Sequence, residues 1–266
     1  MSVNITTAKD IIHYTEELSD HPINHDEGIQ VGTIDTPINH VTVCWMATAE
    51  AIKTAGENGS DLLIAHESLY YPYNVLQMEN PPDDWEAWHV NCQRSDLIEQ
   101  YNLTVMRLHG SVDDICILDD FAEQLGLHNL VYNDGLVKIY EIAECDFDDL
   151  VAHVKQSLHM TGVRVACPAE MPKQIRRIGL PWGGLGLFVN VSYQQALIEQ
   201  GCDVFIAGET DNYGFRFAQE VGIPMIETSH ELSENRGLRH FMEMLAERFV
   251  DIEFMFYENE CVWAMR

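Results

Sequence analysis

The sequence predicts an α/β fold of two lobes, with mixed, mostly parallel sheets flanked by helices. Short apolar runs of the buried-strand type alternate along the chain with amphipathic segments of helical length. Predicted helices of about 10 to 15 residues lie between strands, which suggests right-handed crossovers and a mostly parallel sheet. The 266 residues are 46% apolar, which is enough to bury a large core as one domain or as two lobes.

The elements of the first lobe follow from capping residues, apolar periodicity and glycine positions. Thr6 or Thr7 caps the first helix, and Gly126 ends the last one. The run Asp61–Ala65 is continuously apolar after its first residue, as expected for a strand buried on both faces. The predicted helices are Thr7–Leu18, Ala47–Gly56, His89–Gln100 and Ile115–Leu125, and the predicted strands are Gly28–Ile34, His40–Cys44, Asp61–Ala65 and Leu103–Leu108.

The stretch Tyr70–Trp88 is predicted to be a loop or a lid, because it contains Pro72, Pro81 and Pro82. It is also rich in aromatic residues, which could stack on a base. Packing in a core or at a subunit contact is the more common use of such side chains, so no ligand is assigned to them.

A composition shift near residues 126–135 is the best place for a lobe boundary. We therefore expect a first lobe of residues 1–126, a second lobe of residues 127–227, and a C-terminal segment, 228–266, that packs back onto the first lobe. The predicted strands here are Leu136–Ile142, Ile175–Leu180, Asp203–Ala207, Ile223–Glu227 and Asp251–Tyr257, and the predicted helices are Phe147–Leu158, one ending at Gln200, Asn212–Val221 and Leu238–Phe249.

The acidic balance limits the partners of the chain. Fifteen Lys and Arg against 43 Asp and Glu give a formal net charge of −28, which opposes binding to the phosphate backbone of nucleic acids. The same charge favours cations as ligands, although an adaptation for solubility explains it equally well. No apolar run is long enough for a membrane span, and the first residues do not resemble a secretory signal.

The cysteines favour a cytoplasmic protein. The seven are irregularly spaced and no pair shows C-x-x-C spacing, so neither a disulfide framework nor a zinc knuckle is predicted. We expect a reduced setting with mostly buried thiols, and no neighbouring residue marks one of them as a catalytic thiolate.

Three histidines follow predicted strands, and each has an acidic neighbour. In open α/β sheets ligands bind outside the carboxyl ends of the strands, so these histidines are expected to converge on one site. One acid follows its histidine directly, and the other two lie four residues later, on the same helix face. Six mixed nitrogen and oxygen donors suit two divalent ions that share bridging carboxylates. The three pairs are His66 with Glu67, His109 with Asp113, and His230 with Glu234.

Each of these features also has a plainer interpretation. A single His beside an acid is most often a surface residue or a hydrogen-bonded core residue. The loop Gly183–Gly186 could receive a phosphate or carboxylate on its backbone N–H groups, or be a tight turn with close helix–strand packing. Glu209, at a predicted strand end, is either an acid that supports the ligands or contacts substrate, or a cap for the next helix. Tyr70 excludes an H-E-x-x-H motif at His66, and no G-x-S-x-G frame surrounds Ser68.

Five short motifs, in order along nearly the whole chain, resemble those of one family. They are Glu27-Gly28-Ile29-Gln30-Val31-Gly32, Asp61-Leu62-Leu63-Ile64-Ala65-His66-Glu67-Ser68-Leu69, His109-Gly110-Ser111-Val112-Asp113, Ile206-Ala207-Gly208-Glu209 and Ser229-His230-Glu231-Leu232-Ser233-Glu234. They resemble the family's N-G-L-Q-V-G, D-L-I-I-x-H-H-P-L, H-T-N-L-D, x-T-G-E and G-H-Y-x-T-E. The chain is thereby identified as a member of the GTP cyclohydrolase 1 type 2 homologues, the Nif-three-like family of ring-forming proteins with a dinuclear metal centre.

The resemblance implies a two-lobed α/β subunit, assembled through dimers into a homohexameric ring, with the metal site between the lobes. It implies two divalent metal ions per chain, which would be iron, manganese, zinc or magnesium. Five positions match the family's ligands in residue type: His66, His109, Asp113, His230 and Glu234.

Two positions depart from the family pattern. Glu67 stands where the family usually has a second His. A carboxylate can still ligate, but it hardens the site and moves the preference from zinc towards iron, manganese or magnesium. After Glu209 the family often has a basic run with histidines, where this chain has Asp211-Asn212-Tyr213. Substrate chemistry tied to that run is therefore not assigned to this chain.

The resemblance implies a metal-dependent hydrolase, in which metal-activated water attacks a nucleotide or related substrate. The family label implies opening of the guanine imidazole ring of GTP. Asp113 and Glu234 would be the bridging ligands and Glu209 would move a proton, while the charge of a triphosphate would be offset by Arg176, Arg177, Arg236 or Arg239. The alternative is a non-catalytic metal-binding, metal-delivery or regulatory protein. A nucleotide-binding or thiol-based module that uses the glycine loop ranks last.

Overall fold

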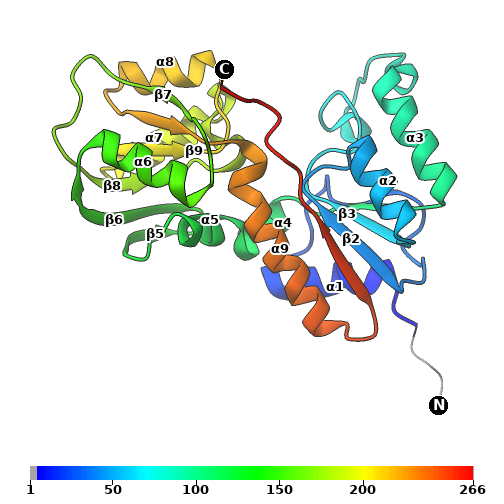
Figure 1. The fold of residues 1–266 in the computed structure, drawn as a ribbon. Coiled ribbons are helices and arrows are strands. Elements are labelled where there is room, and N and C mark those ends of the chain that lie inside the picture. Colours follow the sequence, from blue (N-terminus) through cyan, green and yellow to red (C-terminus); the bar gives the residue numbers. More distant parts are fainter. Residues whose placement is uncertain (1–4, 266) are drawn as a thin grey trace. The chain divides into compact units, whose positions relative to one another are not determined.

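The computed structural model describes residues 5–265, which form two compact units. The first takes the chain up to Cys116 together with Leu238–Asn259, and the second takes Ile117–Gly237 together with the chain from Glu260. The chain thus leaves the first unit after Cys116 and returns to it at Leu238. The lobe boundaries expected from the sequence are residues 126 and 228. Figure 1 shows that each unit consists of one sheet with helices packed on it.

The first unit is a five-stranded sheet with strand order β1-β4-β3-β2-β11. Four of its strands are parallel, and β1 is antiparallel at one edge. The strands are β1 (Gly28–Val31), β2 (His40–Cys44), β3 (Leu62–Ala65), β4 (Thr104–Arg107) and β11 (Glu253–Tyr257), and the helices are α1 (Ala8–Ser19), α2 (Ala49–Glu57), α3 (His89–Tyr101) and the short α4 (Gly110–Val112). α2 and α3 cover one face of the sheet (Figure 1). The core of the first unit includes Ile52, Leu63 and Val105.

Local sequence explains how these elements begin. Thr7 caps α1 in a capping box, in which the carboxylate of Asp10 accepts the Thr7 N–H at 2.8 Å. Thr48 caps α2, because its side chain accepts the N–H of Ala51. Every residue of β3 is buried and the strand lies in the middle of the sheet, as its continuous apolar run predicts.

The predicted loop between β3 and α3 contains two single turns of 3₁₀ helix, Val75–Gln77 and Trp85–Ala87. Asn91 on α3 holds its two ends, since the side-chain amide donates to the carbonyls of Tyr71 (2.6 Å) and Trp85 (2.8 Å). The ring of Tyr70 packs 5.5 Å from that of Trp85. Tyr70 and Trp85 therefore pack against each other within the first unit, the kind of use that the sequence favours.

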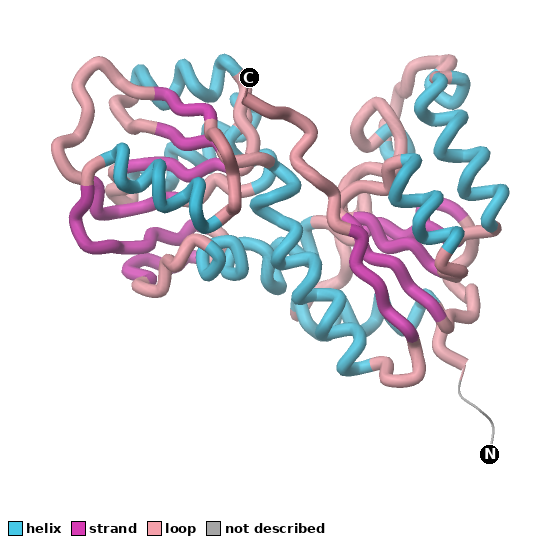
Figure 2. The backbone as a smooth tube through the Cα atoms, viewed as in Figure 1, coloured by secondary structure: helices cyan, strands magenta, loops and turns pink. Residues whose placement is uncertain are grey.

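The second unit is a six-stranded sheet with strand order β5-β6-β8-β9-β10-β7. Its three strands β8, β9 and β10 are parallel, and the pairs on either side of them are antiparallel. The strands are β5 (Leu130–Asp134), β6 (Val137–Cys145), β7 (Arg164–Ala166), β8 (Ile175–Gly179), β9 (Val204–Ala207) and β10 (Met225–Glu227), and the helices are α5 (Leu118–Gln124), α6 (Phe147–Ser157), α7 (Val191–Glu199) and α8 (Asn212–Glu220). Figure 2 shows these strands and the loops between them.

The α/β prediction is confirmed, since both sheets are mixed and flanked by helices. Two antiparallel edge strands, β5 and β7, were not predicted. The three residues of β7 are too few to show the alternation of apolar and polar side chains that marks a strand. β5 forms a hairpin with β6, and the turn between them contains Gly135 at φ +62°.

The helix predicted at Leu238–Phe249 begins eight residues earlier, as α9 (His230–Arg248). Gly237 favoured a later start, because glycine is a poor helix residue. In the structure Gly237 permits a close approach, since a Cβ there would fall 2.6 Å from the Cα of Ile117. The earlier start places His230 and Glu234 on the first turns of one helix.

Within residues 5–265, no helix has the length and the apolar character that crossing a membrane requires. The seven cysteines all lie in this range and form no disulfide. Burial raises the pKa of the Cys44 thiol and raises that of Cys202 to about 12, so neither is a thiolate near pH 7.

A buried ion pair in the second unit gives a stability prediction. Glu227 is 1% exposed and pairs with the half-exposed Arg164, while burial raises the pKa of the Glu227 carboxyl. Arg164→Met should destabilise the fold by about 2 kcal/mol, because it leaves a buried charge unpaired. Because the pKa of Glu227 is higher in the folded state than in the unfolded state, its charged form lowers the stability of the fold at high pH. Below the ordinary Glu pKa of about 4.3 the carboxyl is protonated in both states, and this cost disappears. Denaturant unfolding should therefore show a loss at pH 7 that shrinks towards pH 4.

The matched control is Arg176→Met, which breaks the exposed pair with Glu141 and should leave the unfolding midpoint nearly unchanged. An equal loss in both variants, or a loss for Arg164→Met that is constant with pH, would contradict this prediction.

Candidate metal-binding site

The candidate ligands fall into two sets, one in each unit. The first set belongs to the first unit and the second set to the second unit, and each is described on its own. The first set is His66, Glu67, His109 and Asp113, and the second set is His230 and Glu234, with Glu209 beside them.

The first set lies at the carboxyl ends of two neighbouring parallel strands. β3 ends directly before His66, and β4 ends two residues before His109. The two imidazole rings consequently lie with their centroids 4.7 Å apart. One ligand atom from each of His66, Glu67 and His109 lies within 4.8 Å of the others. This is the arrangement that the strand-end positions of these histidines predict.

His66 is fixed in the orientation of a metal ligand. Its Nδ1 lies 3.0 Å from the carbonyl oxygen of Leu108, which can only accept, so Nδ1 carries the proton. Nε2 therefore presents its lone pair, and it lies 3.8 Å from Oδ1 of Asp113. A ligating histidine commonly donates its other ring N–H to a carbonyl in this way. His66 is also 1% exposed, which protects this arrangement from solvent.

The position of His109 is determined by hydrogen bonds to its backbone and to that of the following turn. Glu27 accepts the backbone N–H groups of His109 (2.5 Å) and Ser111 (3.0 Å), and its other oxygen accepts the Ser111 hydroxyl. Negative charge is favourable at the start of a helical segment, and here α4 begins directly after His109. Asp26 lies 3.8 Å from Nδ1 of His109 and is a partner that the sequence did not reveal.

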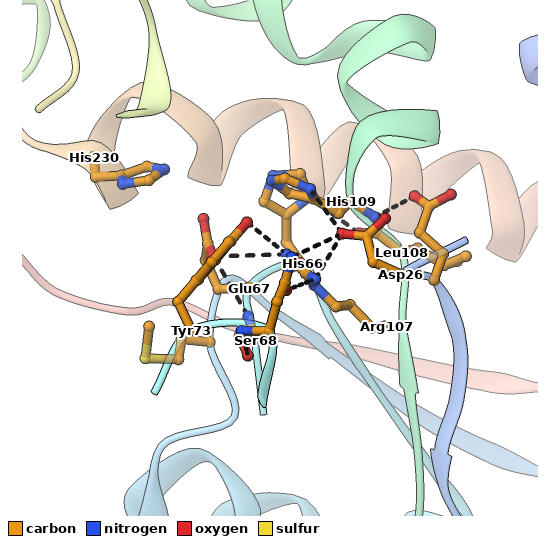
Figure 3. Close-up of polar contacts among 12 residues, drawn as sticks. Asp26, His66, Glu67, Ser68, Tyr73, Arg107, Leu108, His109 and His230 are labelled. Atoms are coloured by element: carbon orange, nitrogen blue, oxygen red, sulfur yellow. Dashed lines mark hydrogen bonds and ion pairs between the residues drawn. The ribbon is translucent and has the colours of Figure 1, made fainter. Parts of the chain in front are cut away.

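Glu67 is a buried carboxylate, 4% exposed. The guanidinium of Arg107, itself 1% exposed, lies 3.9 Å from its Oε2 (Figure 3). Arg107 also pairs with Asp26 at 2.8 Å. The first set and its partners thus contain four carboxylates, those of Asp26, Glu27, Glu67 and Asp113, and one guanidinium, which pairs with Asp26 and Glu67. This formal excess of negative charge favours a bound cation.

The second set centres on His230, which has a carboxylate at each ring nitrogen. Glu209 Oε2 lies 3.0 Å from Nδ1, and Glu234 Oε1 lies 3.3 Å from Nε2. Glu234 is 2% exposed, whereas the Glu209 side chain is about half exposed. A carboxylate that accepts the Nδ1 proton directs the Nε2 lone pair towards Glu234, so both can bind one cation.

The glycine loop packs against this second set. Gly183 has φ +50°, and a Cβ there would fall 2.0 Å from Oε1 of Glu234 and 3.1 Å from Nε2 of His230. Its N–H donates to the Ser233 hydroxyl at 2.9 Å, and its carbonyl accepts the N–H of Glu209 at 2.7 Å. The loop is therefore a tight turn that lets backbone approach the ligands closely, the plainer of its two interpretations.

Comparison with known proteins bears on this site. The family model described as Duf34/NIF3 (NGG1p interacting factor 3) matches residues 6–261. The chain belongs to this family. The predicted family is thereby confirmed, because relatives along most of the chain carry the name given by the sequence resemblance.

Two relatives illustrate the match. "GTP cyclohydrolase 1 type 2" of Helicobacter pylori (strain J99) is 24% identical over 231 residues, which are 85% of this chain and 86% of the relative. "GTP cyclohydrolase 1 type 2 homolog" of Methanocaldococcus jannaschii is 24% identical over 257 residues, which are 93% of this chain and 98% of the relative.

Two solved structures support the fold. The Bacillus cereus protein related to NIF3 superposes with a TM-score of 0.79 at 15% identity, over 99% of this chain and all of that chain. Reduced HcgD from Methanocaldococcus jannaschii superposes with a TM-score of 0.73 at 20% identity, over 97% of this chain and all of that one. At such identities the likeness concerns the fold alone.

Proposed function

We propose that this Duf34/NIF3 chain binds divalent metal ions through His66, Glu67, His109, Asp113, His230 and Glu234, and uses them to hydrolyse a nucleotide or related substrate. The observation that carries the proposal is the first set, in which ligand atoms of His66, Glu67 and His109 lie within 4.8 Å of one another. Three convergent donors of mixed nitrogen and oxygen type are a site that a divalent transition metal prefers.

The residues present fit such an ion. His66 has its Nδ1 proton committed to a carbonyl, and Glu67 and Glu234 are buried carboxylates. Buried carboxylates are stable only when a cation or hydrogen bonds compensate their charge. By the family resemblance, both sets would hold the ions of one dinuclear centre, and Asp113 and Glu234 would be the carboxylates that the two ions share. We also propose, on the same ground, that the chain assembles with copies of itself.

A bound divalent ion supplies Lewis acidity and lowers the pKa of a coordinated water. The chain's own residues then divide the remaining work. Glu209 holds the proton on Nδ1 of His230 at 3.0 Å, which keeps Nε2 basic. Being about half exposed, Glu209 is also placed to exchange a proton with solvent. A nucleotide substrate is supported by relatives named GTP cyclohydrolase 1 type 2.

The test is a hydrolysis assay with the metal-loaded protein on GTP, other nucleotides and generic phosphoesters. We expect turnover that His230→Ala reduces by at least about 100-fold, since a ligand is removed. His13→Ala is the control, because His13 lies 3.3 Å from Glu17 at the same spacing of four but is 73% exposed. Tight stoichiometric metal binding without turnover would instead identify a metal-binding or metal-delivery protein.

Metal identity gives a separate prediction at Glu67. Elemental analysis of the purified protein should find two ions per chain. Glu67→His should move the bound metal towards zinc, because it replaces a hard anionic oxygen with a neutral imidazole. Unchanged metal content and identity in this variant would remove Glu67 from the ligand set.

A further inference from the structure

Arg107 lies at the end of β4, in the middle of the first set, with 1% of its surface exposed. A buried guanidinium is stable only when its donors are matched by acceptors and its charge by anions. Its five N–H donors have a fixed fork geometry, so the partners of Arg107 are held in fixed directions.

Three of its contacts reach the three members of the ligand triad His66, Glu67 and His109. Nε donates to the backbone carbonyl of His66 at 3.0 Å. Nη2 lies 3.9 Å from Glu67 Oε2. Nη1 donates to Asp26 at 2.8 Å, and the same Asp26 oxygen lies 3.8 Å from Nδ1 of His109 (Figure 3). One side chain therefore contacts the backbone of the first ligand, the carboxylate of the second and the partner of the third.

The other contacts of Arg107 reach the loop between β3 and α3. Nη1 also donates to the side-chain carbonyl of Asn74, and Nη2 donates to the Tyr73 hydroxyl at 2.9 Å. The guanidinium carbon lies 5.3 Å from the centroid of the Tyr73 ring. Burial and the charge of Glu67 raise the pKa of Tyr73, so its phenol is neutral near pH 7 and accepts this hydrogen bond. The loop thus completes the shell of acceptors around Arg107.

We propose that Arg107 is the positioning residue of the His66–Glu67–His109 triad, and that through Tyr73 and Asn74 it ties the metal-binding site to the loop of residues 70–78. The metal part of this proposal rests on the proposed function. The guanidinium lies 3.9 Å from Oε2 of Glu67, where its charge orients this carboxylate and compensates it while no ion is bound.

A buried arginine could instead serve the loop alone, and Arg94 is the matched control for that role. Arg94 is also buried, at 3% exposure, and also holds this loop, since it donates to the carbonyl of Leu69 and lies 5.0 Å from the Tyr71 ring centroid. Its hydrogen bonds go to Leu69 and to the sulfur of Met46, outside the triad. A contribution through the loop alone would therefore appear equally in Arg94→Lys and Arg107→Lys.

The experiment compares the two lysine variants of the full chain, which keep the positive charge but lose the planar guanidinium with its fixed N–H donors. Calorimetric titration with Co²⁺ and Mn²⁺, and the d–d spectrum of bound Co²⁺, measure the site directly. Arg107→Lys should weaken binding about 10- to 100-fold, the usual effect of losing a residue that orients ligands, and should change the spectrum. Arg94→Lys should do neither. Wild-type affinity in a folded Arg107→Lys protein, or equal losses in both variants, would overturn the proposal.

A readout on the metal-free protein separates this proposal from the proposed function. Imidazole ¹⁵N–¹H correlation spectra report the tautomer and surroundings of His66 and His109. Arg107→Lys should shift both signals and Arg94→Lys neither. If the wild type binds no metal, the proposed function fails, and these signals alone decide: shifted signals uphold the positioning role and unshifted signals refute it.

If Arg107→Lys does not fold, Asp26→Asn takes its place. It removes the charge between Arg107 and His109 and keeps the shape. This variant should shift the signal of His109 and leave that of His66 unchanged. Two unchanged signals would refute the positioning role.

Discussion

His66→Ala should abolish stoichiometric metal binding by the first set. His66 is the ligand whose direction is most closely determined, because Nδ1 is committed to Leu108 at 3.0 Å and Nε2 lies 3.8 Å from Asp113. Residues that merely orient ligands contribute about 10- to 100-fold in affinity, so the loss of a ligand should exceed about 100-fold. Elemental analysis after purification and calorimetric titration with Zn²⁺, Mn²⁺ and Co²⁺ measure the loss.

His66 is buried, so the fold of the variant must be checked by circular dichroism, and His66→Gln offers a larger side chain if alanine destabilises the protein. His13→Ala is the control, because the His13–Glu17 pair has the same 3.3 Å separation and spacing as His230–Glu234 but lies in solvent. His13→Ala should change neither metal content nor affinity. Retention of the metal by folded His66→Ala protein would remove the first set as a binding site.

The approach of His66 to His109 could be predicted from the sequence because it is a property of topology. A continuous apolar run predicts a central parallel strand, and a histidine directly after such a strand must lie at the carboxyl edge of the sheet. Two neighbouring strands of this kind, β3 and β4, therefore bring their following histidines together. The sequence spacing of 43 residues between them is irrelevant once the strands are paired.

The residues that orient the ligands could not be predicted in this way. Arg107 looks like an ordinary strand residue, and its partners Asp26 and Asn74 lie 81 and 33 positions away in the sequence. Glu27 belongs to a recognisable motif, yet its role as acceptor for His109 depends on a turn that only the folded chain forms. A side chain that acts through tertiary contacts leaves no periodic signal, so its partner becomes visible only in the structure.

The start of α9 shows the same limit in a different form. Propensity places the start after Gly237, because glycine is a poor helix former. Packing overrides that preference, since the close approach of Ile117 requires a residue without a Cβ. The pairing of His230 with Glu234 at a spacing of four was nevertheless anticipated, because that spacing has meaning on any helix that includes both.

Gly183→Ala should damage both the stability of the second unit and the second ligand set. The residue has φ +50°, which an alanine adopts only with strain, and the added Cβ would fall 2.0 Å from Oε1 of Glu234. Strain of about 1 kcal/mol and displacement of a buried carboxylate together should cost about 3 kcal/mol. The clash also pushes Glu234 away from Nε2 of His230, which now lies 3.3 Å from it. Metal affinity should therefore fall together with stability.

Gly135→Ala separates strain from clash. Gly135 has φ +62°, close to that of Gly183, but nothing lies within 4 Å of the position of its Cβ. It should cost about 1 kcal/mol and leave metal affinity unchanged, because only the backbone strain is shared. Denaturant unfolding and metal titration of both variants distinguish the two contributions. Equal losses of stability with unchanged affinity would mean that the glycine loop is required only for its backbone conformation, and that Glu234 does not depend on it.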